Sequence, residues 1–120
     1  MIFESERHEN KYKELLARVG DARAKSLEVK ATLYLVSLVG NEDQLFNFKD
    51  CSIEPEGLNA PWQTGSSSRA TRLAFILWNG NPGAEDPSYN NIYHIFGYSS
   101  WDRYFIEALR IRYQQTTGEV

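Results

Sequence analysis

The chain is poor in the residues that define several common classes of protein. It has one cysteine, Cys51, among 120 residues. A single cysteine rules out a disulfide within the chain and a metal site built from several cysteines. No apolar run approaches the roughly 20 residues that cross a membrane, and the first residues are too polar for a signal peptide. We therefore expect no membrane partner and a protein that acts in the cytosol.

Positive charge is also scarce. Lys and Arg number 13 against 16 Asp and Glu, which gives a formal net charge of -3. Proteins that bind duplex nucleic acid neutralise its phosphates with a surplus of basic residues. We expect no duplex nucleic-acid partner, and any site for an anion has to be local.

Catalytic patterns are missing as well. His94 has no serine or cysteine partner at a recognisable spacing, so a catalytic triad has no support. No paired His and Asp residues indicate a metal site, and the GxxxxGK[ST] pattern of a phosphate-binding loop is absent. We expect no enzyme, no metal and no cofactor.

Aromatic side chains are what the chain has in excess. It contains 3 Trp, 7 Tyr and 6 Phe. A chain of this length forms one domain with one core. Such a core cannot bury all of these rings deeply, so some should line a pocket or a subunit contact. We expect a single domain, residues 1–120, that binds a ligand or a second copy of itself.

Helical periodicity dominates the order of the residues. Apolar side chains recur at spacings of three and four over residues 4–19. A second helix is expected from a cap at Asp21 to about Val39, with a strand over residues 29–39 as the alternative. No period persists over residues 41–65. The expected fold is mainly α, a compact bundle of about four helices. A long ordered loop joins the second and third helices, with room for a short β-hairpin.

The third helix has two different sides. We expect it to begin at one of the serines at 66–68 and to end at Asn79. Its core side should consist of Ala70, Leu73, Ala74 and Leu77. Arg72, Phe75 and Asn79 fall on the opposite side at spacings of three and four. A ring between a guanidinium and an amide suits a purine nucleotide. The alternative is that Phe75 packs beneath the long loop.

The C-terminal third supplies further polar candidates. Residues 80–97 are rich in turn formers and are expected to cover a ligand with side chains such as Asn91 and Tyr93. The last helix is expected to begin at Ser99, and its solvated side should carry Arg103, Glu107 and Arg110. Arg112 instead falls within the apolar arc. A guanidinium there needs an anion or a carboxylate, unless it reaches solvent at the helix end.

Four blocks resemble a known family of small phage and bacterial proteins. They are FNFKD (46–50), IEPEGLNAPWQTGSSS (53–68), RLAFILWNG (72–80) and YFIEALRIRY (104–113). The members of that family include the first-described anti-Thoeris proteins. The resemblance covers roughly residues 44–113, and the EGLN–WQT block within 53–68 is its most specific part.

The resemblance implies sequestration in the host cytoplasm. Members of that family bind, without cleaving, the cyclic ADP-ribose isomers that TIR-domain defence enzymes make. Their sites lie at a subunit interface and use an aromatic stacking residue, an asparagine and arginines. Some members form hexamers and hold cyclic oligonucleotides at a separate site. The implied partners are a cyclic ADP-ribose isomer, cyclic di- or trinucleotides, and further copies of the chain in a dimer or hexamer.

Pattern and resemblance together select seven candidate ligand-binding residues. They are Arg72, Phe75, Asn79, Asn91, Tyr93, Arg110 and Arg112. Two other functions stay open at this point. One is an inhibitor that binds a host defence protein through its aromatic surface, and the other is an enzyme that cleaves a cyclic nucleotide.

Overall fold

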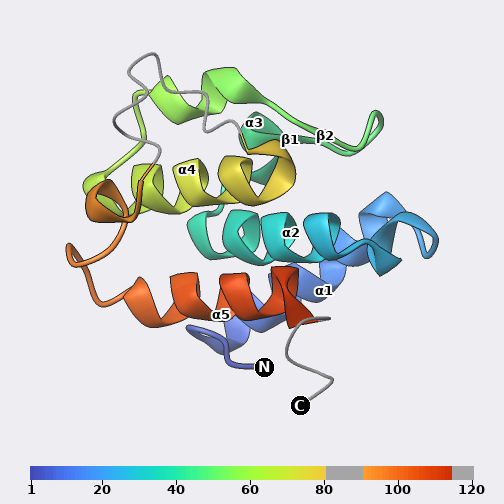
Figure 1. Ribbon diagram of the computed structural model, residues 1–120. Coiled ribbons are helices and arrows are strands. Elements are labelled where there is room, and N and C mark those ends of the chain that lie inside the picture. Colours follow the sequence, from blue (N-terminus) through green and yellow to red (C-terminus); the bar gives the residue numbers. More distant parts are fainter. Residues whose placement is uncertain (81–90, 115–120) are drawn as a thin grey trace.

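Helix α2 lies at the centre of the protein. The computed structural model describes residues 1–80 and 91–114, and within them four helices of 11 to 15 residues dominate. They are α1 (Glu6–Val19), α2 (Leu27–Val39), α4 (Gly65–Asn79) and α5 (Asp102–Arg112). Helix α2 packs against the other three, with α4 and α5 on opposite sides of it (Figure 1). The expected mainly α fold is confirmed.

The burial of α2 decides between the two predictions for its sequence. Residues 31–38 are all buried, and they form a helix and not the alternative strand. The predicted start at Asp21 is wrong. A short 3₁₀ helix, η1 (Arg23–Lys25), comes first, and α2 begins after Ser26. The Ser26 Oγ accepts a hydrogen bond from the Val29 amide at 3.3 Å and so caps the helix.

The aperiodic segment after α2 is ordered by short elements. They are α3 (Glu42–Leu45), the strands β1 (Phe46–Asn47) and β2 (Ser52–Ile53), and the 3₁₀ helix η2 (Pro55–Asn59). The strands pair antiparallel, with Phe46 opposite Ile53, so the expected β-hairpin is confirmed. At its turn the Asn47 Oδ1 accepts hydrogen bonds from the Lys49 and Asp50 amides at 3.0 and 2.9 Å.

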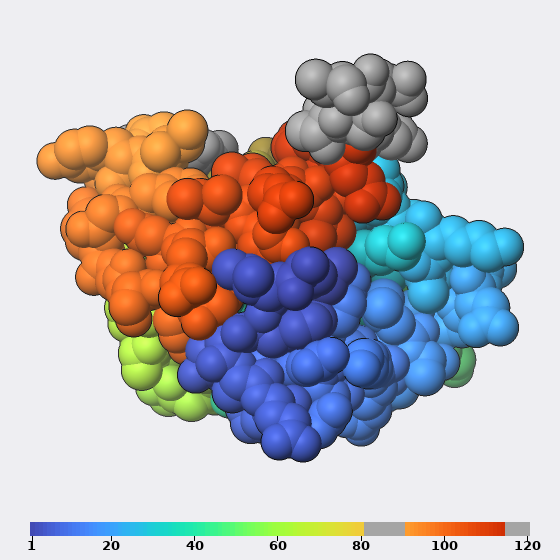
Figure 2. Space-filling view, turned by 90° about the horizontal axis from the view of Figure 1, so that it is seen from below, coloured from blue at the N-terminus to red at the C-terminus, as the bar shows by residue number. Residues whose placement is uncertain are grey.

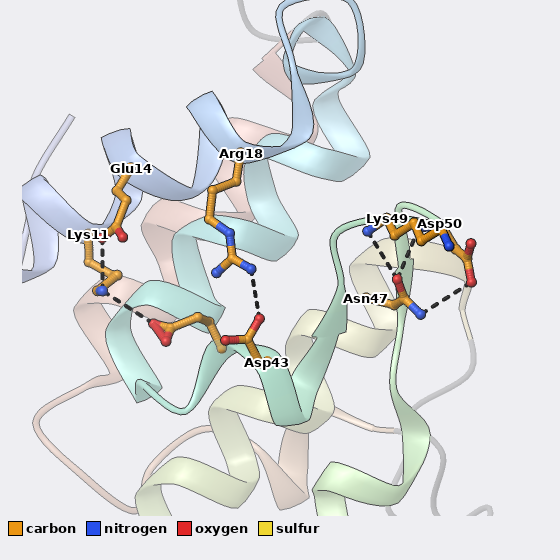
Figure 3. A network of polar contacts seen from close by, with 8 residues as sticks. Lys11, Glu14, Arg18, Asp43, Asn47, Lys49 and Asp50 are labelled. Atoms are coloured by element: carbon orange, nitrogen blue, oxygen red, sulfur yellow. Dashed lines mark hydrogen bonds and ion pairs between the residues drawn. The ribbon is translucent and has the colours of Figure 1, made fainter.

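Polar contacts tie this segment to α1 (Figure 3). The Lys11 ammonium lies 2.8 Å from Glu14 within α1 and 3.5 Å from Glu42 of α3. Arg18 pairs with Asp43 at 2.8 Å and lies over the Phe48 ring at 3.9 Å. Exposed ion pairs of this kind contribute little individually, but together they orient α3 and the hairpin against α1.

Gly57 marks the closest approach between η2 and α3. A Cβ atom at this position would clash with the Gln44 carbonyl oxygen and with the Leu45 side chain. The Gly57 carbonyl also accepts a hydrogen bond from the side-chain amide nitrogen, Nε2, of Gln63 at 2.9 Å. Glycine is needed here for space, because any larger residue would push η2 away from α3.

Helix α4 confirms its predicted end and core side but not its predicted cap. Thr64, rather than one of the following serines, caps it, and Thr64 and Ser67 bond reciprocally in a capping box. The helix ends at Asn79, and Gly80 adopts a left-handed conformation with φ of 83°, which glycine tolerates without strain. Its predicted core residues are all buried: Ala70, Leu73, Ala74 and Leu77.

Helix α5 begins later than predicted and packs beside the N-terminal segment. It starts at Asp102 rather than near Ser99, and the Asp102 carboxylate accepts a hydrogen bond from the Gly97 amide at 2.8 Å. Figure 2 shows the N-terminal segment lying against α5. No helix in the described residues is long and apolar enough to span a membrane.

His8 anchors the N-terminal segment from inside the core. Its ring is buried, and its Nδ1 accepts a hydrogen bond from the Glu4 amide at 3.1 Å. The Nε2 therefore carries the hydrogen and donates to the Tyr34 carbonyl at 2.9 Å. The Tyr34 hydroxyl donates to the Ile2 carbonyl at 2.6 Å. Burial lowers the pKa of His8 below its ordinary value of 6.5.

The space at Gly57 can be tested with alanine. We expect Gly57→Ala to lower the free energy of unfolding by about 1–3 kcal/mol, the usual cost of overpacking. Gly65→Ala is the matched control, because there a Cβ meets only the flexible Arg69 guanidinium, at 3.1 Å. We expect the control to be neutral or slightly stabilising. Urea unfolding measures both, and equal stabilities for the two variants would contradict the close approach.

The lowered pKa of His8 makes stability depend on pH. Below about pH 6.5 the unfolded chain binds a proton more readily than the folded one, so stability should fall as the pH drops below this value. Urea unfolding at pH 7.5 and 5.5 measures the loss. We expect His8→Gln to reduce this pH dependence and His94→Gln to keep it. An unchanged loss in His8→Gln would mean that other groups cause it.

Candidate functional site

A hollow of about 420 Å³ lies where α2 begins and where α4 and α5 end. It is lined by Ser26, Glu28, Trp78 and Arg112. The site exists because α4 and α5 run antiparallel to α2, so that both end on the side where α2 starts (Figure 1). Partial positive charge at the start of α2 therefore lies near partial negative charge at the other two ends.

Arg112 is held in place from two sides. Its Nε donates to the Leu77 carbonyl in the last turn of α4 at 3.2 Å, where carbonyls lack partners within the helix. Its Nη2 lies 3.0 Å from the Glu28 carboxylate. The side chain is 27% exposed, so the guanidinium is partly withdrawn from water. The prediction that Arg112 requires an anionic partner at this position agrees with this pairing.

Glu28 is bound as a carboxylate at the start of α2. The Ser26 hydroxyl donates to its Oε2 at 2.8 Å. This hydrogen bond, the backbone N–H of Glu28 itself and the charge of Arg112 lower the pKa of Glu28 below its ordinary range. The carboxylate is thus ionised at neutral pH, and it occupies the polar side of the hollow.

Trp78 supplies an aromatic surface to the same hollow. The residue is half-buried, and its ring contacts Phe46 edge to face, with centroids 5.5 Å apart and planes at 88°. Such a contact holds the indole in one orientation. An indole beside a guanidinium and a hydroxyl can stack on a planar ring while the polar groups bind attached oxygens.

The placement of Phe75 on a ligand-facing side is wrong. Its side chain is completely buried. Helix α4 is covered by α2 on one side and by η2 on another, which widens its buried arc beyond the predicted stripe. The burial of Phe75 agrees with the alternative, in which its ring packs inside the protein. Arg72 is half-buried and Asn79 is exposed. The predicted ligand-facing side of α4 therefore lacks the aromatic ring that Phe75 was expected to supply.

The other predicted residues are not among those that line this hollow. Arg110 is exposed and pairs with Glu107 at 2.8 Å. The prediction that Glu107 lies on a solvated side of the helix is wrong, since its side chain is buried. Helix α5 packs against α2, and this contact covers more of α5 than the predicted apolar arc. Asn91 caps the 3₁₀ helix η4 (Ile92–His94). The predicted cover spans 80–97, and its residues 81–90 lie outside the described part of the chain.

Tyr93 lines a second hollow near the start of α5. The hollow measures about 490 Å³ and is bounded by Ile92, Tyr93, Phe96, Gly97 and Tyr98. Tyr93 is 76% exposed, and Tyr98 lies under the Arg69 guanidinium at 3.9 Å. Arg112 stands at the opposite end of α5, so the structure does not bring Tyr93 or Asn91 to it (Figure 1).

Sequence reasoning missed three of the four residues that line the first hollow. A start at Asp21 places Ser26 and Glu28 inside the predicted helix, although Ser-Leu-Glu before an apolar run is a recognisable start. Trp78 adjoins the predicted core side of its helix, and its spacing along the helix does not distinguish it from a core residue. Within residues 1–80 and 91–114, no group of three or more His, Cys, Asp or Glu is placed to hold a metal ion.

Comparison with known proteins gives a family but no function. The model of a family of unknown function (DUF6075) matches residues 1–119. No curated protein and no solved structure matches the chain.

Proposed function

This chain belongs to the DUF6075 family of unknown function, and we propose that it binds and sequesters a small cyclic nucleotide without cleaving it. The ligand we propose is a cyclic ADP-ribose isomer made by a TIR-domain defence enzyme, and the place of action is the host cytoplasm. Two arguments support the proposal. One is the resemblance of residues 44–113 to anti-Thoeris proteins, and the other is the geometry of the hollow that Arg112 lines.

The observation that carries the proposal is that Arg112 and Trp78 line the same hollow. A guanidinium donates two parallel hydrogen bonds to a phosphate, which makes arginine well suited to a pyrophosphate. An indole face stacks on a base. Trp78 thereby takes the stacking role expected of Phe75. The volume of about 420 Å³ lies within the range on the order of 300–1,000 Å³ typical of small-molecule sites.

A second copy of the chain is part of the proposal. The hollow offers one arginine among its lining residues, whereas a pyrophosphate has several oxygens to satisfy. A dimer or hexamer would bring donors from a neighbouring subunit, as the resemblance implies. Cyclic di- or trinucleotides are proposed as further ligands at a separate site.

A protein-binding inhibitor is the second candidate function. It is favoured by the aromatic surface around η4, where Ile92 is 71% and Tyr93 76% exposed. Aromatic residues are enriched among those that dominate binding between proteins. This function would need a host defence factor as the partner and no nucleotide.

Ligand binding and recovery test the leading proposal. We expect cyclic ADP-ribose isomers to raise the melting temperature, since a free ligand at 100 times its Kd adds about 2.7 kcal/mol of stability. Ligand released from the denatured protein should be intact by mass spectrometry, and native mass spectrometry should show it bound to an oligomer. Recovery of cleaved ligand would favour an enzyme. No thermal shift, together with capture of a host defence protein, would favour the inhibitor.

Arg112 should contribute directly to binding. We expect Arg112→Ala to weaken the affinity for a cyclic ADP-ribose isomer by about 1.5–3 kcal/mol, the usual contribution of a hydrogen bond to a charged group. Arg103→Ala is the matched control, because Arg103 is an exposed arginine of the same helix. Calorimetric titration measures both. Unchanged affinity in Arg112→Ala with a lowered melting temperature would assign Arg112 a structural role only.

A further inference from the structure

We propose that Glu28 is an internal anion that competes with the phosphate of a ligand for Arg112. This inference rests on the proposed function and concerns the same hollow. A ligand would have to displace Glu28 from Arg112, so a ligand with more negative charge would bind more tightly than one with less. When no ligand is present, Glu28 would occupy the polar side of the site.

The first support is that Glu28 occupies the groups that a phosphate would need. One carboxylate oxygen lies 3.0 Å from the Arg112 Nη2, and the other accepts from the Ser26 hydroxyl at 2.8 Å. A phosphate presents oxygens to guanidinium and hydroxyl donors in the same way. A ligand phosphate can therefore bind the Arg112 guanidinium and the Ser26 hydroxyl only after the Glu28 carboxylate has moved away from them.

The second support is that Arg112 keeps one of its two contacts when Glu28 moves away. Its Nε is fixed by the Leu77 carbonyl at 3.2 Å, on a different helix from Glu28. The guanidinium would keep this anchor after the carboxylate moves away. Ser26 also stays in place, because its Oγ accepts from the Val29 amide as the cap of α2.

The third support is that Glu28 can leave at small cost. Its side chain is 42% exposed, so it can rotate into water without losing buried packing. Ion pairs at the protein surface are weak, and the two charges of a pyrophosphate can replace the single charge of Glu28 beside Arg112. The carboxylate is thus a displaceable partner of Arg112 rather than a permanent one.

The test compares Glu28→Gln with wild type and with Glu6→Gln. Glu6 is an exposed acidic residue in the first turn of α1, so its substitution removes the same charge at a similar helix position. Cyclic ADP-ribose and inorganic pyrophosphate are titrated into each protein by calorimetry. We expect Glu28→Gln to bind both probes about two- to fivefold more tightly, the range that an exposed ion pair represents. Glu6→Gln should match wild type.

The outcomes separate this inference from the proposed function. Equal or weaker binding of cyclic ADP-ribose by Glu28→Gln, where wild type binds it, would overturn the competition and make Glu28 a support for Arg112. A similar gain in Glu6→Gln would overturn it too, as an effect of net charge. Tighter pyrophosphate binding by Glu28→Gln without any binding of cyclic ADP-ribose would support the internal anion and overturn the proposed ligand. No binding of either probe to any protein would overturn both.

Discussion

The burial of α2 on every side is the constraint on which the rest of the structure depends. Residues 31–38 are buried without interruption, and a helix that is apolar all round has to be covered by other elements. Helices α1, α4 and α5 provide the cover. The polar groups of α2 are satisfied inside the core: Thr32 donates to the Ala74 carbonyl at 3.4 Å and Ser37 to the Tyr34 carbonyl at 2.8 Å. These contacts leave α2 with its two ends as the places where it can meet solvent.

That constraint also places the candidate site. Because α4 and α5 cover α2 in the antiparallel direction, their last turns meet at its first turn (Figure 1). Arg112 satisfies a carbonyl of α4 and a carboxylate of α2 at once. It therefore joins three helices. Arg112 thus stabilises the contact between these helices, and at the same position it lines the hollow together with Trp78.

The EGLN–WQT block within residues 53–68 serves packing in this structure. Gly57 allows η2 to approach α3. Gln63 donates to the Gly57 carbonyl at 2.9 Å and to Thr71 at 3.1 Å, and it accepts from Ser67 at 2.6 Å. Trp62 donates to Gln44 at 2.7 Å. The EGLN–WQT block thus ties α3, η2 and α4 together.

The sequence by itself determined that the fold is mainly helical, and it determined the core side of α4. Apolar residues at helical spacing predicted that the chain is helical and predicted the core residues of α4. The Asn-Gly pair at 79–80 predicted where α4 ends. Both signals depend on neighbouring residues along the chain. Only the tertiary structure decided which other sides are covered. Phe75 is buried and Trp78 lines the hollow, and α4 packs against both α2 and η2. Ser26, Glu28 and Arg112 meet because α2 begins where α4 and α5 end. Spacing along one helix carries no information about such a meeting.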